Sequence, residues 1–249
     1  MPTIGVAIIT KNAQAHLAAC LQSLTWCDQV VILDSGSTDQ TLNIAQSHGA
    51  QIHQSIDWPG FGIQKNRAIA LLETDWIFAL DADEIVNAQL ADSIQAAVQN
   101  PQSEVYQLNR LSNYCGRWMR HTGWHPDYLP RLFKKGSARY SEDLVHERLI
   151  FSSSVSQLDG LLLHYSFDDL ESVLDKINRY SSAGAQQRLN KGSRSSLSSA
   201  IFKGVWTFIR SYIIKRGFLD GREGFILSVS NAEGAYYRQL KLMYLQEKV

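Results

Sequence analysis

The 249-residue sequence lacks an excess of charge of either sign and lacks metal-spaced cysteines. Its 24 lysine and arginine residues balance 24 aspartate and glutamate residues, so no overall field attracts nucleic acid, and we expect no nucleic-acid partner. The three cysteines, Cys20, Cys27 and Cys115, form an odd set without metal-ligand spacing. Such a set indicates reduced thiols in a cytosolic setting rather than a disulfide framework.

The sequence also lacks a long apolar run, and we expect no signal peptide. No run reaches the roughly 20 apolar residues that a membrane-spanning helix requires. The chain opens directly on a strand-like segment without a preceding basic region, which argues against a signal peptide. We therefore predict a cytoplasmic globular protein that can at most lie on a membrane surface.

What is present in the first half is an alternation of strands and helices. Apolar, β-branched runs at residues 4–10, 29–34, 50–53 and 76–80 are separated by helical patterns at 13–24, 38–48 and 61–72. Strands joined by helices of this length form a parallel sheet with helices on both faces. The sequence therefore predicts an α/β, Rossmann-like fold with a mostly parallel sheet.

Acidic residues follow the last of these strands. The stretch WIFALDADE begins as a buried strand at Trp76 and ends in Asp81, Asp83 and Glu84. The carboxyl ends of parallel strands form a ligand-binding edge, and two acids that flank one small residue can reach the same hard cation. The alternative is the acidic first turn of a helix, because a helix is expected from about Asn87.

Two further segments place candidate ligand contacts beside this edge. Asp34 ends the second strand before a glycine turn, where an acid can accept hydrogen bonds from the ring or ribose of a nucleotide. Ser37 follows in the same loop, either as a ligand contact or as part of a well-capped helix start. Lys65 follows another glycine turn and could neutralise a diphosphate, or it could lie on the solvated face of an amphipathic helix.

The second half begins with an alternating strand pattern at 104–111, followed by a segment rich in aromatic and basic residues up to Arg131. Aromatic rings stack on sugar rings, and arginines pair with phosphates, so Trp124 and Arg131 are candidates for substrate binding. The alternative is an aromatic core with surface arginines.

Four N-terminal motifs together resemble family 2 of the glycosyltransferases, inverting enzymes with the GT-A fold. These motifs are IITKN at 8–12, DSGSTD at 34–39, QKNRA at 64–68 and LDADE at 80–84. Four further motifs resemble, more narrowly, the branch that contains lipopolysaccharide core glycosyltransferases, some of them assigned as β-1,4-glucosyltransferases of the inner core. They are GRWMRHTGWHPDYLPRLFKKG at 116–136, VHE at 145–147, HYSF at 164–167 and GFLDGREGF at 217–225.

The resemblance implies roles for particular residues. Asp34 matches the acid on the uracil or ribose side of the nucleotide, and Thr10 and Asn12 lie in the first nucleotide-binding loop. Lys65 and Asn66 match the basic helix start near the donor.

The same resemblance implies a metal site. Asp81 and Asp83 match the motif that faces the ribose and holds a divalent ion, Mg²⁺ or Mn²⁺, on the diphosphate. A histidine in the region of His164 completes the metal shell in some GT-A enzymes, although a structural role for His164 is an equal alternative.

An inverting transfer needs a general base near the acceptor hydroxyl. Glu147 is the first candidate, because the ring of the adjacent His146 could orient it, and Asp127 is the second. Glu142 and Asp143 form an acidic pair, but this pair lies closer to the LDADE motif than is usual in the family. The choice of base therefore stays open at this stage.

The C-terminal part reads as three helices, at 168–190, 197–214 and 221–247, with a break at 190–196. The middle helix combines an apolar face with lysines and arginines, so we expect residues 197–216 to contact a membrane surface. Packing on the catalytic domain, or on a second subunit of a homo-oligomer, is the alternative. We predict a catalytic domain at 1–190, with a nucleotide-sugar half at 1–110 and an acceptor half at 111–190, and a basic helical extension at 191–249.

The combined expectation is a metal-dependent inverting glycosyltransferase. It would move a sugar, glucose by preference, from a UDP-sugar to a lipopolysaccharide core or related lipid-linked saccharide at the inner face of the cytoplasmic membrane. A nucleotidyltransferase is one alternative, but it would need a glycine-rich phosphate loop after the first strand, which ITKNAQ lacks. A non-catalytic membrane-associated module that retains the fold is the other.

Overall fold

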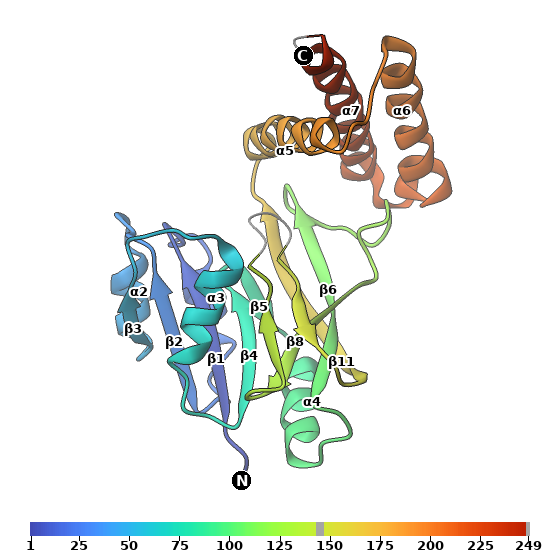
Figure 1. Cartoon of the computed structure of the whole chain (residues 1–249). Coiled ribbons are helices and arrows are strands. Elements are labelled where there is room, and N and C mark those ends of the chain that lie inside the picture. The colour runs from blue at the N-terminus through green and yellow to red at the C-terminus, as the bar shows by residue number, and fades with distance from the viewer. Residues whose placement is uncertain (143–146, 248–249) are drawn as a thin grey trace. The chain divides into compact units, whose positions relative to one another are not determined.

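The computed structural model describes residues 1–142 and 147–247 and confirms the α/β fold (Figure 1). The strands are β1 (Ile4–Thr10), β2 (Gln29–Asp34), β3 (Gln51–Gln54), β4 (Trp76–Asp81), β5 (Glu84–Val86), β6 (Val105–Tyr114), β7 (Arg117–Trp118), β8 (Asp127–Lys134), β9 (Ala138–Tyr140), β10 (Leu149–Phe151) and β11 (Val155–Phe167). The helices are α1 (Leu17–Gln22), α2 (Thr41–Ser47), α3 (Phe61–Ala70), α4 (Ala88–Gln99), α5 (Leu170–Asn190), α6 (Leu197–Ile209) and α7 (Gly221–Gln246). A π-helical turn, η1 (Arg210–Ile214), and a 3₁₀ turn, η2 (Gly217–Asp220), join α6 to α7.

One large sheet organises the first part of the chain. Its strands run in the order β3-β2-β1-β4-β8-β6-β11-β5, and β7 pairs with β6. Strands β3, β2, β1 and β4 are parallel, whereas β8 joins both β4 and β6 in antiparallel pairs. Strands β9 and β10 form a separate antiparallel pair. The βαβ alternation of the sequence therefore produces the parallel part of the sheet, and the later strands extend it.

The apolar runs are buried on both faces of the parallel strands. Val6 and Ile8 pack in one core cluster with residues of α1 and α4, whereas Ala7 packs in a second cluster with residues of α3. Alternate residues of one strand thus enter two cores, which explains why the sequence shows continuous rather than alternating hydrophobicity. The parallel strands thus lie between helices on both faces of the sheet.

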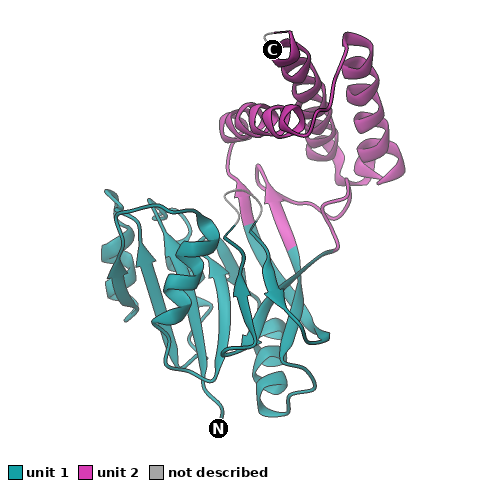
Figure 2. Ribbon diagram, in the orientation of Figure 1, with its two compact units in different colours: residues 1–110, 127–164 teal, residues 111–126, 165–249 magenta. Residues whose placement is uncertain are grey.

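The described chain divides into two compact units (Figure 2). The first comprises residues 1–110 and 127–164, and the second comprises residues 111–126 and 165–249. The predicted boundary between residues 190 and 191 falls inside the second unit, because α5 packs on α7. The division into a catalytic domain and an extension stays a prediction about function.

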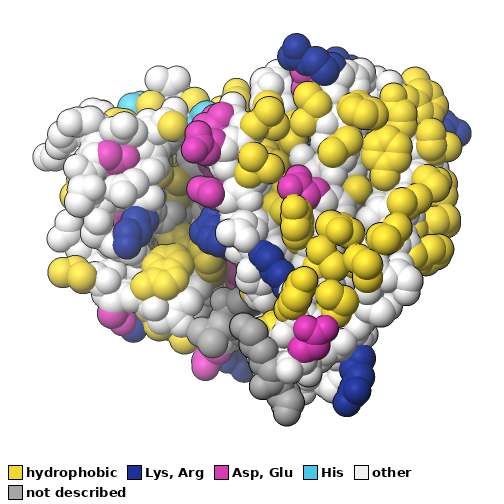
Figure 3. Space-filling model, turned by 90° about the horizontal axis from the view of Figure 1, so that it is seen from above, with side chains coloured by type: hydrophobic (Ala, Val, Ile, Leu, Met, Phe, Trp, Pro, Cys, Tyr) yellow, Lys and Arg dark blue, Asp and Glu magenta, His cyan; other side chains and the backbone are white. Residues whose placement is uncertain are grey.

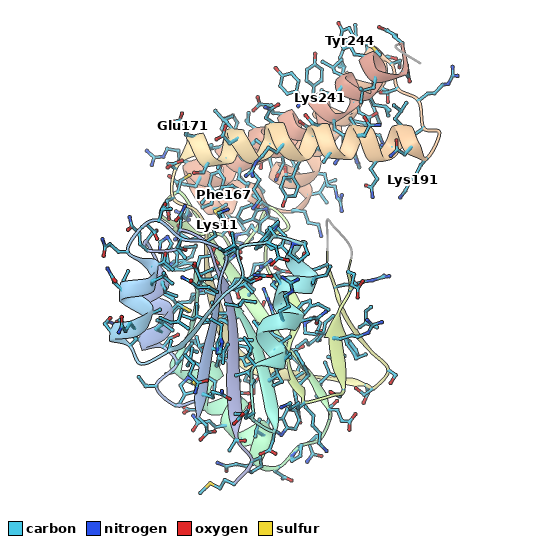
Figure 4. The ribbon with its side chains drawn as sticks, turned by 60° about the vertical axis from the view of Figure 1, so that its left-hand side comes forward. Lys11, Phe167, Glu171, Lys191, Lys241 and Tyr244 are labelled. Carbon is cyan, nitrogen blue, oxygen red and sulfur yellow. The ribbon has the colours of Figure 1, made fainter. Side chains whose placement is uncertain are left out.

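The second unit has a small core of its own. Tyr114, Met119, Val173 and Leu227 are buried there together. Lys241 of α7 donates hydrogen bonds to the Asn178 carbonyl oxygen at 3.0 Å and to Ser181 Oγ at 2.8 Å, which ties α7 to α5 (Figure 4). Among the described residues, no helix is long and apolar enough to cross a bilayer.

Candidate active site

Strand register brings the predicted acids to one edge of the sheet. Thr10 at the end of β1 pairs with Asp34 of β2, and the preceding Ile9 pairs with Asp81 of β4. Asp34 and Asp81 therefore flank the carboxyl end of β1, where open α/β sheets bind their ligands. The predicted juxtaposition of these two acids is confirmed.

Asp34 organises its own loop. Its carboxylate is fully buried and accepts hydrogen bonds from Thr10 Oγ1 at 2.9 Å, from the Gly36 N–H at 2.9 Å, and from the N–H at 2.8 Å and the hydroxyl of Ser37. Gly36 has a φ of +84°, which favours glycine at this turn. Both Asp34 oxygens thus serve the loop in this structure, and a direct contact of Asp34 with a nucleotide stays a prediction.

The first loop is joined to the second by Asn12. The Asn12 N–H donates to Ser37 Oγ at 2.8 Å, and the Asn12 Oδ1 accepts from the Thr38 N–H at 2.8 Å. Asn12 adopts a φ of +52°, a left-handed conformation that asparagine tolerates better than most residues. Thr10, Asn12, Asp34 and Ser37 therefore form one hydrogen-bonded frame at the sheet edge, with Lys11 between its first two members (Figure 4).

Asp81 lies between two cations. Its Oδ1 is 3.0 Å from Lys65 Nζ, and its Oδ2 is 2.7 Å from Arg131 Nη2. Burial alone would raise the pKa of Asp81, but Arg131 and Lys65 outweigh burial and hold this pKa well below its usual range. Asp81 is therefore an anion whose two oxygens are both engaged by protein cations.

Glu84 is the buried centre of a wider charge network. Its Oε2 accepts from the Asp81 N–H at 2.9 Å, and its Oε1 lies 3.1 Å from Arg131 Nη2 and 3.6 Å from Arg110 Nη1. Arg110 in turn pairs with Asp127 at 2.8 Å. Burial raises the pKa of Glu84 above its ordinary value, although the charge of Arg131 opposes the shift. The turn after β4 is thus held in place by a network of ion pairs between alternating acidic and basic side chains.

Arg131 was predicted to bind substrate. In this structure its guanidinium is buried and lies against Asp81 and Glu84. Asp81 and Glu84 together raise the pKa of Arg131 even though burial lowers it. These contacts hold the turn after β4 in place, and a role for Arg131 in substrate binding stays a prediction.

Asp83 and His164 lie close together at the turn after β4. Strand β5 pairs with β11 so that Glu84 lies opposite His164, and this register brings His164 Nε2 to 3.5 Å from Asp83 Oδ2. The Asp83 side chain is 42% exposed, so it faces solvent rather than the core. A carboxylate and an imidazole are suitable ligands for a divalent ion such as Mn²⁺, so these two side chains fit the predicted metal site. Asp81 fits it less well, because Lys65 and Arg131 occupy its oxygens.

Helix α3 supplies Lys65 and Asn66. Lys65 Nζ lies 3.2 Å from Glu147 Oε1 as well as beside Asp81, and Asp81 raises the pKa of Lys65 against the opposing effect of burial. Asn66 exchanges two 2.9 Å hydrogen bonds with the backbone of Tyr140, which anchors β9 to α3. A Cβ on Gly62 would overlap the Ser141 carbonyl oxygen, so the glycine permits the close approach that brings Glu147 to Lys65.

The candidate bases have different surroundings. Glu147 pairs with Lys65, Asp127 pairs with Arg110, and Glu142 is exposed. Asp143 and His146 lie outside the described residues. Glu147 therefore shares the Lys65 amine with Asp81, and the choice of base stays a prediction.

Trp124 belongs to the second unit. Its ring packs edge-on against Tyr114, with ring centroids 5.7 Å apart, and lies 6.2 Å from the ring of Phe167. A role for Trp124 in acceptor binding stays a prediction.

Arg110 was not singled out from the sequence, although it connects Glu84 to Asp127. The alternating pattern of residues 104–111 gave the only signal, because it placed a charged residue on a strand expected to have one wet face. Which acids this arginine meets depends on the pairing of β6 with β8.

Comparison with known proteins supports one family. The model of the family described as "Glycosyl transferase family 2" matches residues 5–154. An uncharacterized glycosyltransferase of Rickettsia prowazekii is 30% identical over 261 aligned residues, which cover 100% of this chain and 89% of the relative. The lipopolysaccharide core biosynthesis glycosyltransferase LpsC of Rhizobium meliloti is 29% identical over 251 residues, which cover 96% of this chain and 91% of LpsC.

A solved structure supports the fold. The crystal structure of S. aureus TarS in complex with UDP aligns with a TM-score of 0.50 and 15% identity, and the alignment covers 99% of this chain and 92% of that one. The family match covers strands β2 to β10, nearly all of β1, and both loops of the candidate site, and it ends before β11 and His164. The chain therefore belongs to glycosyl transferase family 2 and has the GT-A fold.

Proposed function

We propose that this family 2 glycosyltransferase is a metal-dependent inverting enzyme. It moves a sugar, glucose by preference, from a UDP-sugar to a lipopolysaccharide core or related lipid-linked saccharide. The observation that carries the proposal is the arrangement of Asp83, His164, Lys65 and Glu147 around the turn after β4. The arrangement offers metal ligands, a cation for a diphosphate and a carboxylate base within one unit.

The proposed classes of donor and acceptor are supported by the hydrogen bonds of the candidate site and by similar proteins. The hydrogen-bonded frame of Thr10, Asn12, Asp34 and Ser37 forms a rigid sheet edge of the kind that holds a nucleotide in α/β folds. The TarS structure contains UDP, which favours a uridine nucleotide here, and LpsC takes part in lipopolysaccharide core synthesis, which favours that acceptor class. With a lipid-linked acceptor, the enzyme would act at the cytoplasmic face of a membrane.

We assign Asp83 and His164 as the protein ligands of a divalent ion, Mn²⁺ or Mg²⁺. When bound, the ion neutralises the negative charge that develops on the diphosphate leaving group. Among residues 1–142 and 147–247, no group of three or more His, Cys, Asp or Glu side chains is placed so that it could hold a metal ion. Asp83 and His164 would thus be the two protein ligands, and two protein ligands would suffice for an ion that is also bound by the substrate, as is common for Mg²⁺.

Lys65 connects the donor site to the base. Its amine is shared between Asp81 and Glu147. A bound diphosphate competes for this amine and releases the Glu147 carboxylate. The acceptor hydroxyl oxygen then attacks the anomeric carbon, its proton passes to Glu147, and the bond to the UDP oxygen breaks with its electron pair on the diphosphate.

The base variants test this mechanism. Glu147→Gln should lower kcat by at least about a hundredfold, the low end of what general-base catalysis contributes, and should not raise the donor KM, because the diphosphate no longer competes with a carboxylate for Lys65. Asp127→Asn should have a smaller effect on kcat, because Asp127 is paired with Arg110 rather than with Lys65, the amine for which the diphosphate competes. The measurement is UDP release from UDP-glucose and other UDP-sugars with Mn²⁺ and a lipopolysaccharide core saccharide.

Glu142→Gln is the matched control, because Glu142 is an exposed acid in the same segment. It should keep the wild-type kcat. If Glu147→Gln also keeps it, or if Asp127→Asn causes the larger loss, Glu147 is not the base. If no UDP-sugar is turned over by the wild-type protein, the proposed function fails as a whole.

A further inference from the structure

Helix α6 buries its small residues, with Gly204 against α7, and exposes its large apolar residues to solvent. Ala200 and Gly204 are its buried positions, and a Cβ on Gly204 would lie 3.2 Å from Tyr236 Cβ of α7. The outward residues are 39–63% exposed. They are Leu197, Ile201, Phe202, Val205, Trp206 and Ile209. A helix that packs on its neighbour through small residues needs another apolar environment for the opposite face.

The exposed apolar face continues beyond α6. Ile213 and Ile214 of η1, Phe218 and Leu219 of η2, and Phe225 of α7 are each 47–56% exposed. The view from above shows hydrophobic side chains gathered over the part of the molecule that carries the C-terminal helices (Figure 3). We call the exposed apolar residues of α6, η1, η2 and the start of α7 the apolar face. Its extent exceeds the scattered surface hydrophobics of an ordinary monomer.

The charge of the surrounding segment is all of one sign. Residues 191–216 contain no aspartate or glutamate, whereas the whole chain has equal numbers of acidic and basic residues. The segment contains the cations Lys191, Arg194, Lys203, Arg210, Lys215 and Arg216. The next acid, Asp220, is buried and accepts hydrogen bonds from the backbone and ring of His121. The charged side chains of residues 191–216 that accompany the apolar face are thus all cations, and in residues 217–225 the mostly buried Glu223 is paired with Arg222.

We propose that the apolar face docks on an anionic lipid bilayer, with its large side chains in the interface and its lysines and arginines on the headgroups. Apolar burial and attraction to anionic headgroups add to each other in such helices. A second copy of the chain would bring two segments of the same positive charge together, which disfavours self-association through this face. The inference rests on the proposed function only in that a lipid-linked acceptor places the enzyme at a membrane.

Vesicle co-sedimentation of the full chain tests the docking surface. The wild-type protein should bind vesicles of phosphatidylcholine with phosphatidylglycerol, bind pure phosphatidylcholine vesicles more weakly, and lose binding to the anionic vesicles as salt rises. The double variant Phe202→Ser, Trp206→Ser should lower the partition coefficient on anionic vesicles by at least about tenfold. It loses two exposed aromatic rings that would be buried in the bilayer interface.

Val155→Ser is the matched control, since Val155 is an exposed apolar residue of the first unit. It should bind vesicles as the wild type does, and both variants should keep the wild-type melting temperature. UDP release with a lipid-free saccharide acceptor should be unchanged by the Phe202 and Trp206 substitutions. Absent binding to anionic vesicles, or equal binding by the double variant, overturns the inference.

Two outcomes separate this inference from the proposed function. A wild-type protein that releases UDP normally but does not bind anionic vesicles would overturn the docking surface alone, whereas a wild-type protein that binds these vesicles but releases no UDP from any UDP-sugar would overturn the proposed function alone. A wild-type dimer that the Phe202 and Trp206 substitutions dissociate, with no effect on vesicles, would show that a second copy covers the face and would also overturn the inference.

Discussion

Replacing Asp83 by asparagine should lower kcat/KM for UDP-sugar turnover by at least about a hundredfold, which is typical for the loss of one electrostatic stabiliser of a transition state. The amide keeps the shape of the side chain but removes the charge that would hold a divalent ion beside His164. Because Asp83 is substantially exposed and lies outside the buried Arg131 pairs, the melting temperature should stay the same. The measurement is UDP release across a Mn²⁺ titration with saturating acceptor.

Asp92→Asn provides the control for this prediction. Asp92 is an exposed aspartate of α4, so the same chemical change should leave turnover and its Mn²⁺ dependence as in the wild type. Full turnover by Asp83→Asn at every Mn²⁺ concentration would remove Asp83 from the metal site.

Replacing Arg131 by leucine should reduce the free energy of unfolding by about 3–5 kcal/mol, the usual cost of removing one partner of a buried ion pair. Arg131 is 6% exposed, and it compensates the fully buried Glu84 at 3.1 Å as well as Asp81 at 2.7 Å. Without the guanidinium, the ion pair that remains to Glu84 within residues 1–142 and 147–247 is the longer one with Arg110, at 3.6 Å. Urea unfolding followed by circular dichroism measures the change.

The second substitution Glu84→Gln should recover at least about half of this loss. Glutamine removes the buried charge and can still accept the Asp81 N–H, so the two substitutions should be strongly non-additive. Arg139→Leu is the control, because Arg139 is an exposed arginine of β9. Additive effects of Arg131→Leu and Glu84→Gln would show that Arg131 does not stabilise the fold through Glu84.

The sheet and its acidic edge could be predicted because the relevant signals are local. The strand at 4–10 is an apolar run between a short N-terminal segment and a polar loop, and its bounds in the structure are the same. Asp81 ends a strand that is buried on both faces, so a parallel neighbour had to bring Asp34 to the same edge. The α/β fold therefore followed from patterns within windows of about ten residues.

The partners of the site residues could not be predicted in the same way. Lys65 meets Glu147 across 82 positions of sequence, and Arg131 meets Asp81 across 50. These contacts between residues far apart in the sequence depend on strand register and on the close packing that Gly62 allows. A basic residue that pairs with a phosphate and one that pairs with a buried carboxylate have the same appearance in a sequence, so the contacts of Arg131 with Asp81 and Glu84 could not be predicted.

Asp34 shows the same limit within a single loop. An acid at a strand end before a glycine has one sequence signature, whether its oxygens face a ligand or the N–H groups of the following turn. In the structure they accept from Gly36 and Ser37. The acid still serves the candidate site, because it shapes the loop that lies next to the end of β1.

The central claim is that this sheet edge binds a uridine diphosphate through a divalent ion at Asp83 and His164. Calorimetric titration of the full chain with UDP tests it most directly, in Mn²⁺ and again in EDTA, for the wild type and for Asp83→Asn. We predict that Mn²⁺ tightens UDP binding to the wild type by at least about tenfold, as expected for loss or gain of one metal contact, and that Asp83→Asn binds UDP weakly in both conditions. Equal affinity of the wild type with and without Mn²⁺, or a full Mn²⁺ effect in Asp83→Asn, would contradict the claim.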